Sequence, residues 1–107
     1  MITVANRIPV KPEAAKDFEE TFRKRLGHVD NFEGFVAFRL LRPSKPEDPY
    51  VVLTFWEKEE NFRAWTQSDD FKEQHKGSRE TAEAVFSGPV KIEIHEVVQE
   101  SGASLSS

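Results

Sequence analysis

The fold is decided by the stretch from Phe35 to Trp56, which reads FVAFRLL (35–41), RPSKPEDP (42–49) and YVVLTFW (50–56). The first and third segments are rich in β-branched and aromatic residues, so each predicts a β-strand. Three prolines exclude a helix or strand from the loop between them. Both strands are apolar on both faces, whereas an antiparallel strand with one solvated face alternates apolar and polar residues. The sequence therefore predicts a sheet whose two faces are both covered.

A helix is predicted before this stretch. Pro12 suits the first turn of a helix, and apolar residues recur at helical spacing from there to Val29, over four or five turns. These residues are Ala15, Phe18, Phe22, Leu26 and Val29. Glu19 precedes Arg23 by four residues, a spacing that predicts an ion pair on the outer face of the helix.

The remaining segments complete an α+β pattern. Residues 2–10 and 90–97 alternate apolar and polar side chains, as half-buried strands do. Residues 57–65 predict a helix, and Ser68 predicts the N-cap of a second, short helix. The order strand–helix–strand–strand–helix–strand is that of the ferredoxin-like fold, with both helical segments on one face of the sheet.

The composition narrows the class of protein. The chain has 107 residues, 19 acidic against 15 basic residues, and no cysteine. This length suits one domain, which we assign to residues 1–98, with the serine-rich residues 99–107 as a flexible tail. The net charge of −4 argues against nucleic-acid binding, and the mean hydropathy of −0.60 argues against a membrane span. The lack of cysteine and of a signal peptide suits a cytoplasmic protein.

The second face of the sheet predicts a partner. Two helical segments can cover only one face, and the polar tail and the proline-rich loop are poorly suited to cover the other. A large apolar patch left in water exceeds what soluble monomers usually expose. We therefore predict a homodimer packed sheet to sheet with two-fold symmetry, which gives a dimeric α+β barrel.

Three residues are candidates for chemistry, and each has a structural alternative. Asn6 interrupts the apolar row of the first strand; it is either a functional amide or an edge or bulge residue bonded to the backbone. Trp65 fits core packing on periodicity alone. His75 shares a helix face with Phe71, and as a cation it would be stabilised by the C-terminal end of that helix. The sequence contains no nucleotide-binding glycine loop, no motif for a flavin and no paired histidines at metal-ligand spacing.

Several of these residues together resemble a known family. The motifs are Asn6-Arg7-Ile8-Pro9-Val10 before the helix at Pro12, Gly34-Phe35, Trp56-Glu57, and the segment from Ala64 to Lys76, AWTQSDDFKEQHK. Over residues 1–98 the chain resembles the antibiotic biosynthesis monooxygenase (ABM) superfamily, and within it the heme-degrading IsdG- and MhuD-type monooxygenases. The segment that holds Trp65 and His75 is the most specific part of the resemblance.

The resemblance implies a role for each candidate. His75 would be the axial ligand of heme iron, and Asn6 would lie on the opposite, distal side with its amide bonded to a ligand of the iron. Trp65 would press on the porphyrin and bend it out of plane. Phe22 and Phe71 would be walls of the pocket, and Arg25 would be a basic residue near it.

The resemblance also implies an activity. Heme would be both substrate and cofactor, its ring would be cleaved with dioxygen, and iron would be released. Since the chain carries no flavin or nicotinamide motif and no thiol, an external electron donor would be needed. Two alternatives remain at this point: a cofactor-independent monooxygenase acting on a quinol or polyphenol, and a heme-binding protein without enzymatic activity.

Overall fold

The computed structural model describes residues 1–25, 29–74 and 83–102, and within them the predicted order of elements is confirmed. The elements are β1 (Ile2–Ile8), the 3-10 helix η1 (Pro12–Ala14), α1 (Ala15–Arg25), β2 (Phe35–Leu41), β3 (Tyr50–Trp56), α2 (Glu59–Thr66), α3 (Asp69–Gln74) and β4 (Lys91–Glu96). A further helical turn covers residues 83–85.

The four strands form one antiparallel sheet in the order β2-β3-β1-β4, as the ferredoxin-like fold requires. In the centre of β1, Asn6 lies opposite Val52 of β3 and opposite Ile92 of β4. The pairing of β2 with β3 is irregular between Phe35 and Ala37. Because directly paired residues point to the same side of a sheet, this register assigns each side chain to a face.

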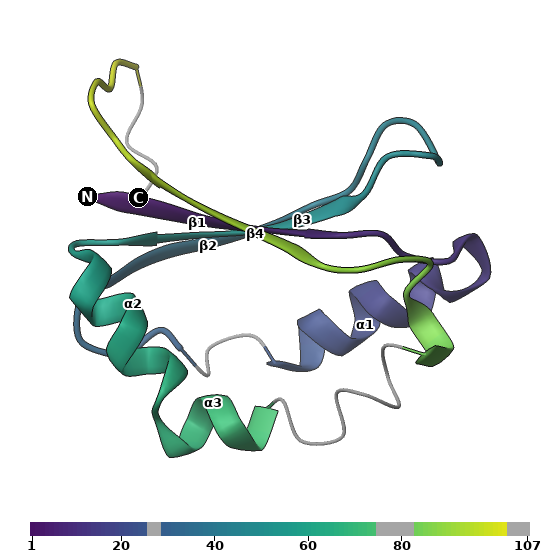
Figure 1. The fold of residues 1–107 in the computed structure, drawn as a ribbon, viewed down its shortest axis with the longest axis horizontal. Helices are drawn as coiled ribbons and strands as arrows, with labels where there is room; N and C mark the ends of the chain where they lie inside the picture. Colours follow the sequence, from purple (N-terminus) through teal and green to yellow (C-terminus); the bar gives the residue numbers. More distant parts are fainter. Residues whose placement is uncertain (26–28, 75–82, 103–107) are drawn as a thin grey trace.

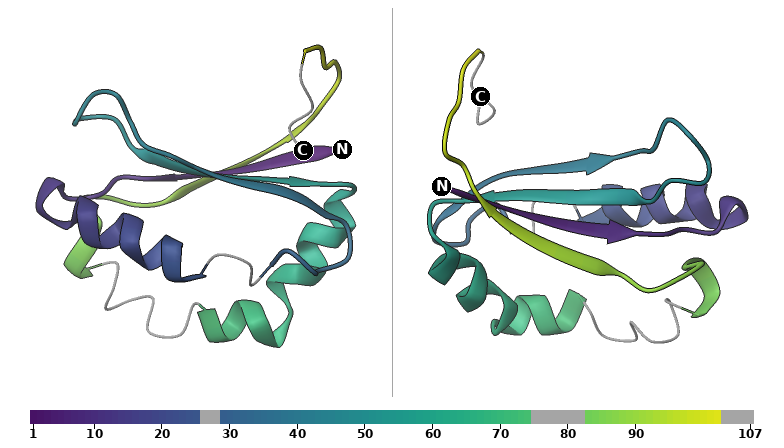
Figure 2. Two further views of the ribbon diagram at one scale, coloured as in Figure 1. Left: turned by 180° about the vertical axis from the view of Figure 1, so that it is seen from behind. Right: turned by 45° about the horizontal axis from the view of Figure 1, so that its top comes forward.

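The helices α1, α2 and α3 all lie on one side of the sheet (Figures 1 and 2). We call this side the covered face and the other side the open face. The even-numbered residues of β1 and β3 point to the covered face, where Val4 is completely buried and Trp56 is 1% exposed. The prediction that the helices occupy a single face is confirmed.

The open face carries a second set of apolar side chains. They are Ala37, Leu41, Val51, Leu53 and Phe55. No labelled helix lies over them, although the β2–β3 loop and the chain after β4 rise on this side at its two ends (Figure 1). Strands β2 and β3 therefore carry apolar side chains on both faces, as predicted, and the helices cover only one of these faces.

The first helix is shorter than its periodicity predicts. Val29 lies in a bend rather than in the helix, so this part of the prediction is wrong, and Leu26 lies outside the described residues. Val29 still packs against the buried cluster that includes Val4 and Trp65. Val29 is therefore apolar because it packs on the core, although it lies in a bend and not in a helix.

The chain after β4 adds no further element in its described part. Residues 97–102 form no helix or strand, and residues 103–107 lie outside the described residues, so the flexible tail over 99–107 stays a prediction. Within the described ranges, none of the helices is long and apolar enough to cross a membrane.

Candidate functional site

Asn6 lies between two hydrophobic clusters on the covered face. The tryptophan cluster consists of Ile2, Val4, Trp56 and Trp65. The phenylalanine cluster consists of Ile8, Phe18, Tyr50 and Val52. Among the described residues the two clusters share no member. Along β1, Val4 belongs to the first cluster and Ile8 to the second, so Asn6 stands on the same face at their boundary.

The Asn6 side chain is half-buried, and no described residue forms a hydrogen bond with its carboxamide. Its backbone is paired regularly on both sides, because β1 lies between β3 and β4. The alternative interpretation, an edge or bulge residue bonded to the backbone, is therefore wrong. Amides removed from water are normally hydrogen-bonded. A carboxamide without a partner between two apolar clusters is thus well placed to bond a ligand.

Trp65 is a core residue in this structure. It is 7% exposed, and its ring packs edge to face on Phe32 and Phe71, with centroids 5.4 and 5.9 Å away. Helix α2 also carries Phe62, three residues earlier, which packs on Trp56 at 5.9 Å. The core-packing interpretation of Trp65 is confirmed, while its contact with a ligand stays a prediction.

The two predicted aromatic walls lie on different clusters. Phe71 of α3 packs on Trp65, in the tryptophan cluster. Phe22 of α1 packs on Phe18 at 5.0 Å and stacks on Phe38 at 6.0 Å, in the phenylalanine cluster. Both side chains are half-buried. The structure therefore brings Phe71 and Trp65 together and places Phe22 on the other side of the boundary that Asn6 marks.

Two predicted residues cannot be placed in the same detail. His75 and the side chain of Arg25 lie outside the described residues, so their roles stay predictions. The helix that leads to His75 is described: the Ser68 hydroxyl accepts a hydrogen bond from the Phe71 backbone N–H at 3.1 Å, which confirms the predicted N-cap. Helix α3 then runs to Gln74, directly before His75.

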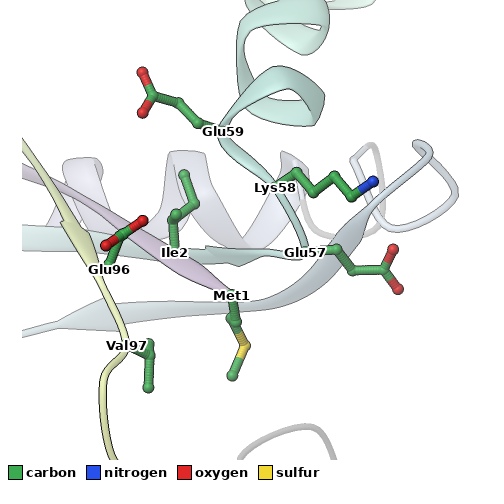
Figure 3. A pocket seen from close by; sticks show the side chains of 7 residues that line it. All are labelled: Met1, Ile2, Glu57, Lys58, Glu59, Glu96 and Val97. Atoms are coloured by element: carbon green, nitrogen blue, oxygen red, sulfur yellow. The ribbon is translucent and has the colours of Figure 1, made fainter.

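Two surface hollows lie away from Asn6. The larger, about 370 Å³, is at the end of β1 where α2 begins (Figure 3). Its lining residues are Met1, Ile2, Glu57, Lys58, Glu59, Glu96 and Val97. Three carboxylates against one lysine would repel a ligand that is itself a carboxylate. The smaller hollow, about 260 Å³, lies beside Arg42 and Tyr50.

Glu19 forms a contact that its helical spacing does not predict. Instead of an ion pair with Arg23, its carboxylate accepts hydrogen bonds from Nε and Nη2 of Arg42, at 2.8 and 2.6 Å, and from the Tyr50 hydroxyl. Arg23 bonds Glu20 instead, at 3.0 Å. This network ties α1 to the β2–β3 loop. The Arg42 guanidinium, followed by the Tyr50 hydroxyl, holds the pKa of Glu19 at about 2, below its ordinary value of 4.5.

We expect Glu19→Gln to destabilise the protein by about 1 kcal/mol at pH 7, because the exposed Arg42 is partly screened by water. Since the folded pKa of Glu19 is lower than the unfolded one, its contribution is complete above about pH 4.5 and is lost as the pH falls toward 2. Urea unfolding at pH 7 and pH 3 measures both effects, and the variant should differ from wild type less at pH 3. Glu20→Gln, on the same helix, is the control and should change stability little.

The sequence matches a known family. Residues 1–77 match the family model described as antibiotic biosynthesis monooxygenase. The chain therefore belongs to the antibiotic biosynthesis monooxygenase family, and the resemblance read from its motifs is confirmed.

Its relatives narrow the branch of the family. The chain is 37% identical over 97 residues to the mycobilin-producing heme oxygenase of Mycobacterium tuberculosis H37Rv, covering 91% of this chain and 90% of the relative. It is 38% identical over 101 residues to the staphylobilin-producing heme oxygenase of Staphylococcus haemolyticus, covering 88% and 95%. The solved structure of the heme-degrader MhuD from M. tuberculosis, with two hemes bound in its active site, has a TM-score of 0.79 and 36% identity, covering 95% and 100%.

Proposed function

We propose that this protein is a heme-degrading monooxygenase that cleaves the porphyrin with dioxygen and releases iron. The observation that carries the proposal is the half-buried amide of Asn6, which lies at the boundary between two apolar clusters and forms no hydrogen bond with a described residue. The names of the similar proteins, heme oxygenases with more than a third of residues identical, support the same activity.

The residues present suit heme as a ligand. Heme is a flat apolar ring with two carboxylates, so it needs apolar walls, a polar group near the iron and a cation at the rim. The side chains of Trp65 and Phe71 on one side and Phe22 on the other supply apolar surface next to Asn6. His75 would hold the iron, because a single imidazole is enough when the porphyrin supplies four nitrogens. Arg25 would bind a carboxylate of the heme.

Heme and the residues of the chain would each contribute a different part of the reaction. When bound, heme supplies the iron that activates dioxygen and the ring that is oxidised. The Asn6 amide would donate a hydrogen bond into the distal space, where a fixed dipole stabilises charge that develops during the reaction. Trp65, held from behind by Phe32, would press on the ring and keep it bent. The electrons would come from an external donor, which is consistent with a reducing cytoplasm and a chain without cysteine.

Titration with hemin, followed by ascorbate, tests the proposal. We expect a Soret band typical of ligated heme at micromolar hemin and its bleaching when ascorbate and dioxygen are present. Binding without bleaching would indicate a heme-binding protein without activity. A lack of binding would contradict the proposal and favour a monooxygenase that acts on a quinol or polyphenol, which a panel of quinols would then identify.

We expect Asn6→Ala to slow the bleaching about 10- to 100-fold while hemin still binds, because one fixed, partly exposed hydrogen-bond donor is lost. The rate of Soret decay under ascorbate measures the effect. Asn31→Ala is the matched control, since it removes the same amide from an exposed residue in the turn before β2. An Asn6→Ala variant that bleaches at the wild-type rate would exclude a role for the amide.

We also propose that two copies of the chain pack through their open faces. The apolar side chains of Val51 and Leu53 point to this face, are only half-buried and have no labelled helix over them. Light scattering after size exclusion should give twice the chain mass of 12.3 kDa. Leu53→Lys should shift the protein to monomer, because it places a charge inside the interface. A wild-type monomer at micromolar concentration would contradict this proposal.

A further inference from the structure

Two isoleucines of β4 are unusually exposed for their place in the sheet. Ile92 lies opposite Asn6 and Ile94 lies opposite Val4, so both point to the covered face. Ile92 is 57% exposed and Ile94 is 40% exposed, whereas Val4 and Ile8 on the neighbouring strand are almost completely buried. Neither isoleucine belongs to the tryptophan or the phenylalanine cluster as these are described. The covered face therefore has an open apolar strip beside Asn6.

The pattern of β4 shows that this strip is specific to one face. The strand lies at the edge of the sheet, where charged side chains are common. Its open face carries Lys91, Glu93 and His95, and Glu93 bonds Arg7 at 2.8 Å. On the covered face, β4 carries Ile92 and Ile94 opposite Asn6 and Val4, and its charged residue there, Glu96, lies at the far end of the strand opposite Ile2. An edge strand that only needed protection from water would not place two isoleucines on its partly solvated side.

We propose that Ile92 and Ile94 form a third apolar wall of the heme site and position the porphyrin against Asn6. The inference rests on the proposed function and names the residues that contact the ring rather than the iron. Side chains opposite each other on neighbouring antiparallel strands stand about 5 Å apart, so a ring that reaches the Asn6 amide also covers Ile92. Ile94, two residues along β4, extends the same wall toward the tryptophan cluster.

Heme is the occupant that these features favour. The strip lies beside the Asn6 amide, which has no hydrogen bond to a described residue, and it runs along β1 from Asn6 toward Val4 of the tryptophan cluster. A flat hydrocarbon ring would bury both isoleucines at once while leaving its carboxylates free to reach water or a cation. The two isoleucines would therefore contact the porphyrin ring, and this contact would not depend on a metal in the ring.

The variants Ile92→Thr and Ile94→Thr test this inference with hemin and with metal-free protoporphyrin IX. Threonine keeps the β-branch, and both positions are exposed, so the fold of the ligand-free protein should not change; circular dichroism and thermal unfolding check this. We expect each variant to bind both probes about tenfold more weakly, because a methyl group is lost and a hydroxyl is buried against the ring. Val98→Thr, at a valine that is 92% exposed beyond β4, is the matched control and should bind like wild type.

The outcomes separate this inference from the proposed function. If wild type binds hemin and the threonine variants bind both probes as tightly as wild type, Ile92 and Ile94 do not contact the porphyrin. The proposed function is then unaffected. If only hemin binding weakens, the isoleucines act through the iron and the inference is also wrong. If wild type binds neither probe, both the proposed function and the proposed contact of the isoleucines with the porphyrin are contradicted. A loss for both probes in both variants, with Val98→Thr unchanged, supports the wall.

Discussion

Replacing His75 with alanine is expected to abolish the Soret band of ligated heme and to weaken hemin binding by more than about 100-fold. Mutation of a residue that only hydrogen-bonds a metal ligand typically lowers metal affinity or activity about 10- to 100-fold. Loss of the ligand itself should lower the affinity for hemin by more than this. The chain has no cysteine that could replace the imidazole. Absorbance titration measures both the band and the affinity, and added imidazole should restore the band in the variant.

The control for His75 is chosen from the structure. His95 lies on β4 opposite Thr3, so it points to the open face, away from Asn6. His95→Ala should therefore leave the titration unchanged. A His75→Ala variant that keeps the wild-type band would assign the axial ligand to another residue, and His28 would be the next to replace.

Replacing Trp65 with alanine should strongly destabilise the protein even without heme. The side chain is 7% exposed and packs between Phe32 and Phe71, so its removal should cost about 3 to 5 kcal/mol of unfolding free energy. Trp65→Phe keeps an aromatic ring in the core and should cost less. If Trp65 also bends the porphyrin, the phenylalanine variant should bind hemin and bleach more slowly. Urea unfolding and Soret decay measure the two effects separately.

Trp56 provides a matched control for this experiment. It belongs to the same cluster, is 1% exposed and donates a hydrogen bond from its indole to Thr54 at 3.0 Å. It lies opposite Ile2, at the end of β1 away from the centre of the site. Trp56→Phe should therefore destabilise the protein and leave the bleaching rate unchanged. If Trp65→Phe behaves in the same way, Trp65 is a core residue without a role in the reaction.

The spacing of apolar residues predicts most of the fold, because the helices are amphipathic and the strands are either alternating or continuously apolar. The strands over 35–41 and 50–56 agree with the structure in their bounds. Helical spacing wrongly predicts a helix at Val29, because an apolar residue in a turn can fall at that spacing by chance. The partner of Glu19 could not be predicted either, since Arg42 lies 23 residues away and reaches it only after the β2–β3 loop has folded against α1.

The candidate site was only partly accessible from the sequence. Asn6 could be identified because it interrupts an apolar row, but its two interpretations could be separated only when β1 proved to be a central strand. The place of Ile92 depends on the pairing of strands that are separated by more than 80 residues. In the sequence Ile92 is an ordinary apolar residue of an alternating strand, and only the register places it beside the Asn6 amide.

The separation of the core into two clusters gives the substrate a structural role. If heme packs against both clusters, as we propose, it would join two parts of the core that are separate among the described residues. By mass action, such binding would add to the unfolding free energy of the folded chain. Opening of the porphyrin would convert this rigid ring into a flexible linear molecule. Each catalytic cycle would thus return the protein to its less stable, ligand-free state, and the reaction itself would promote departure of the product.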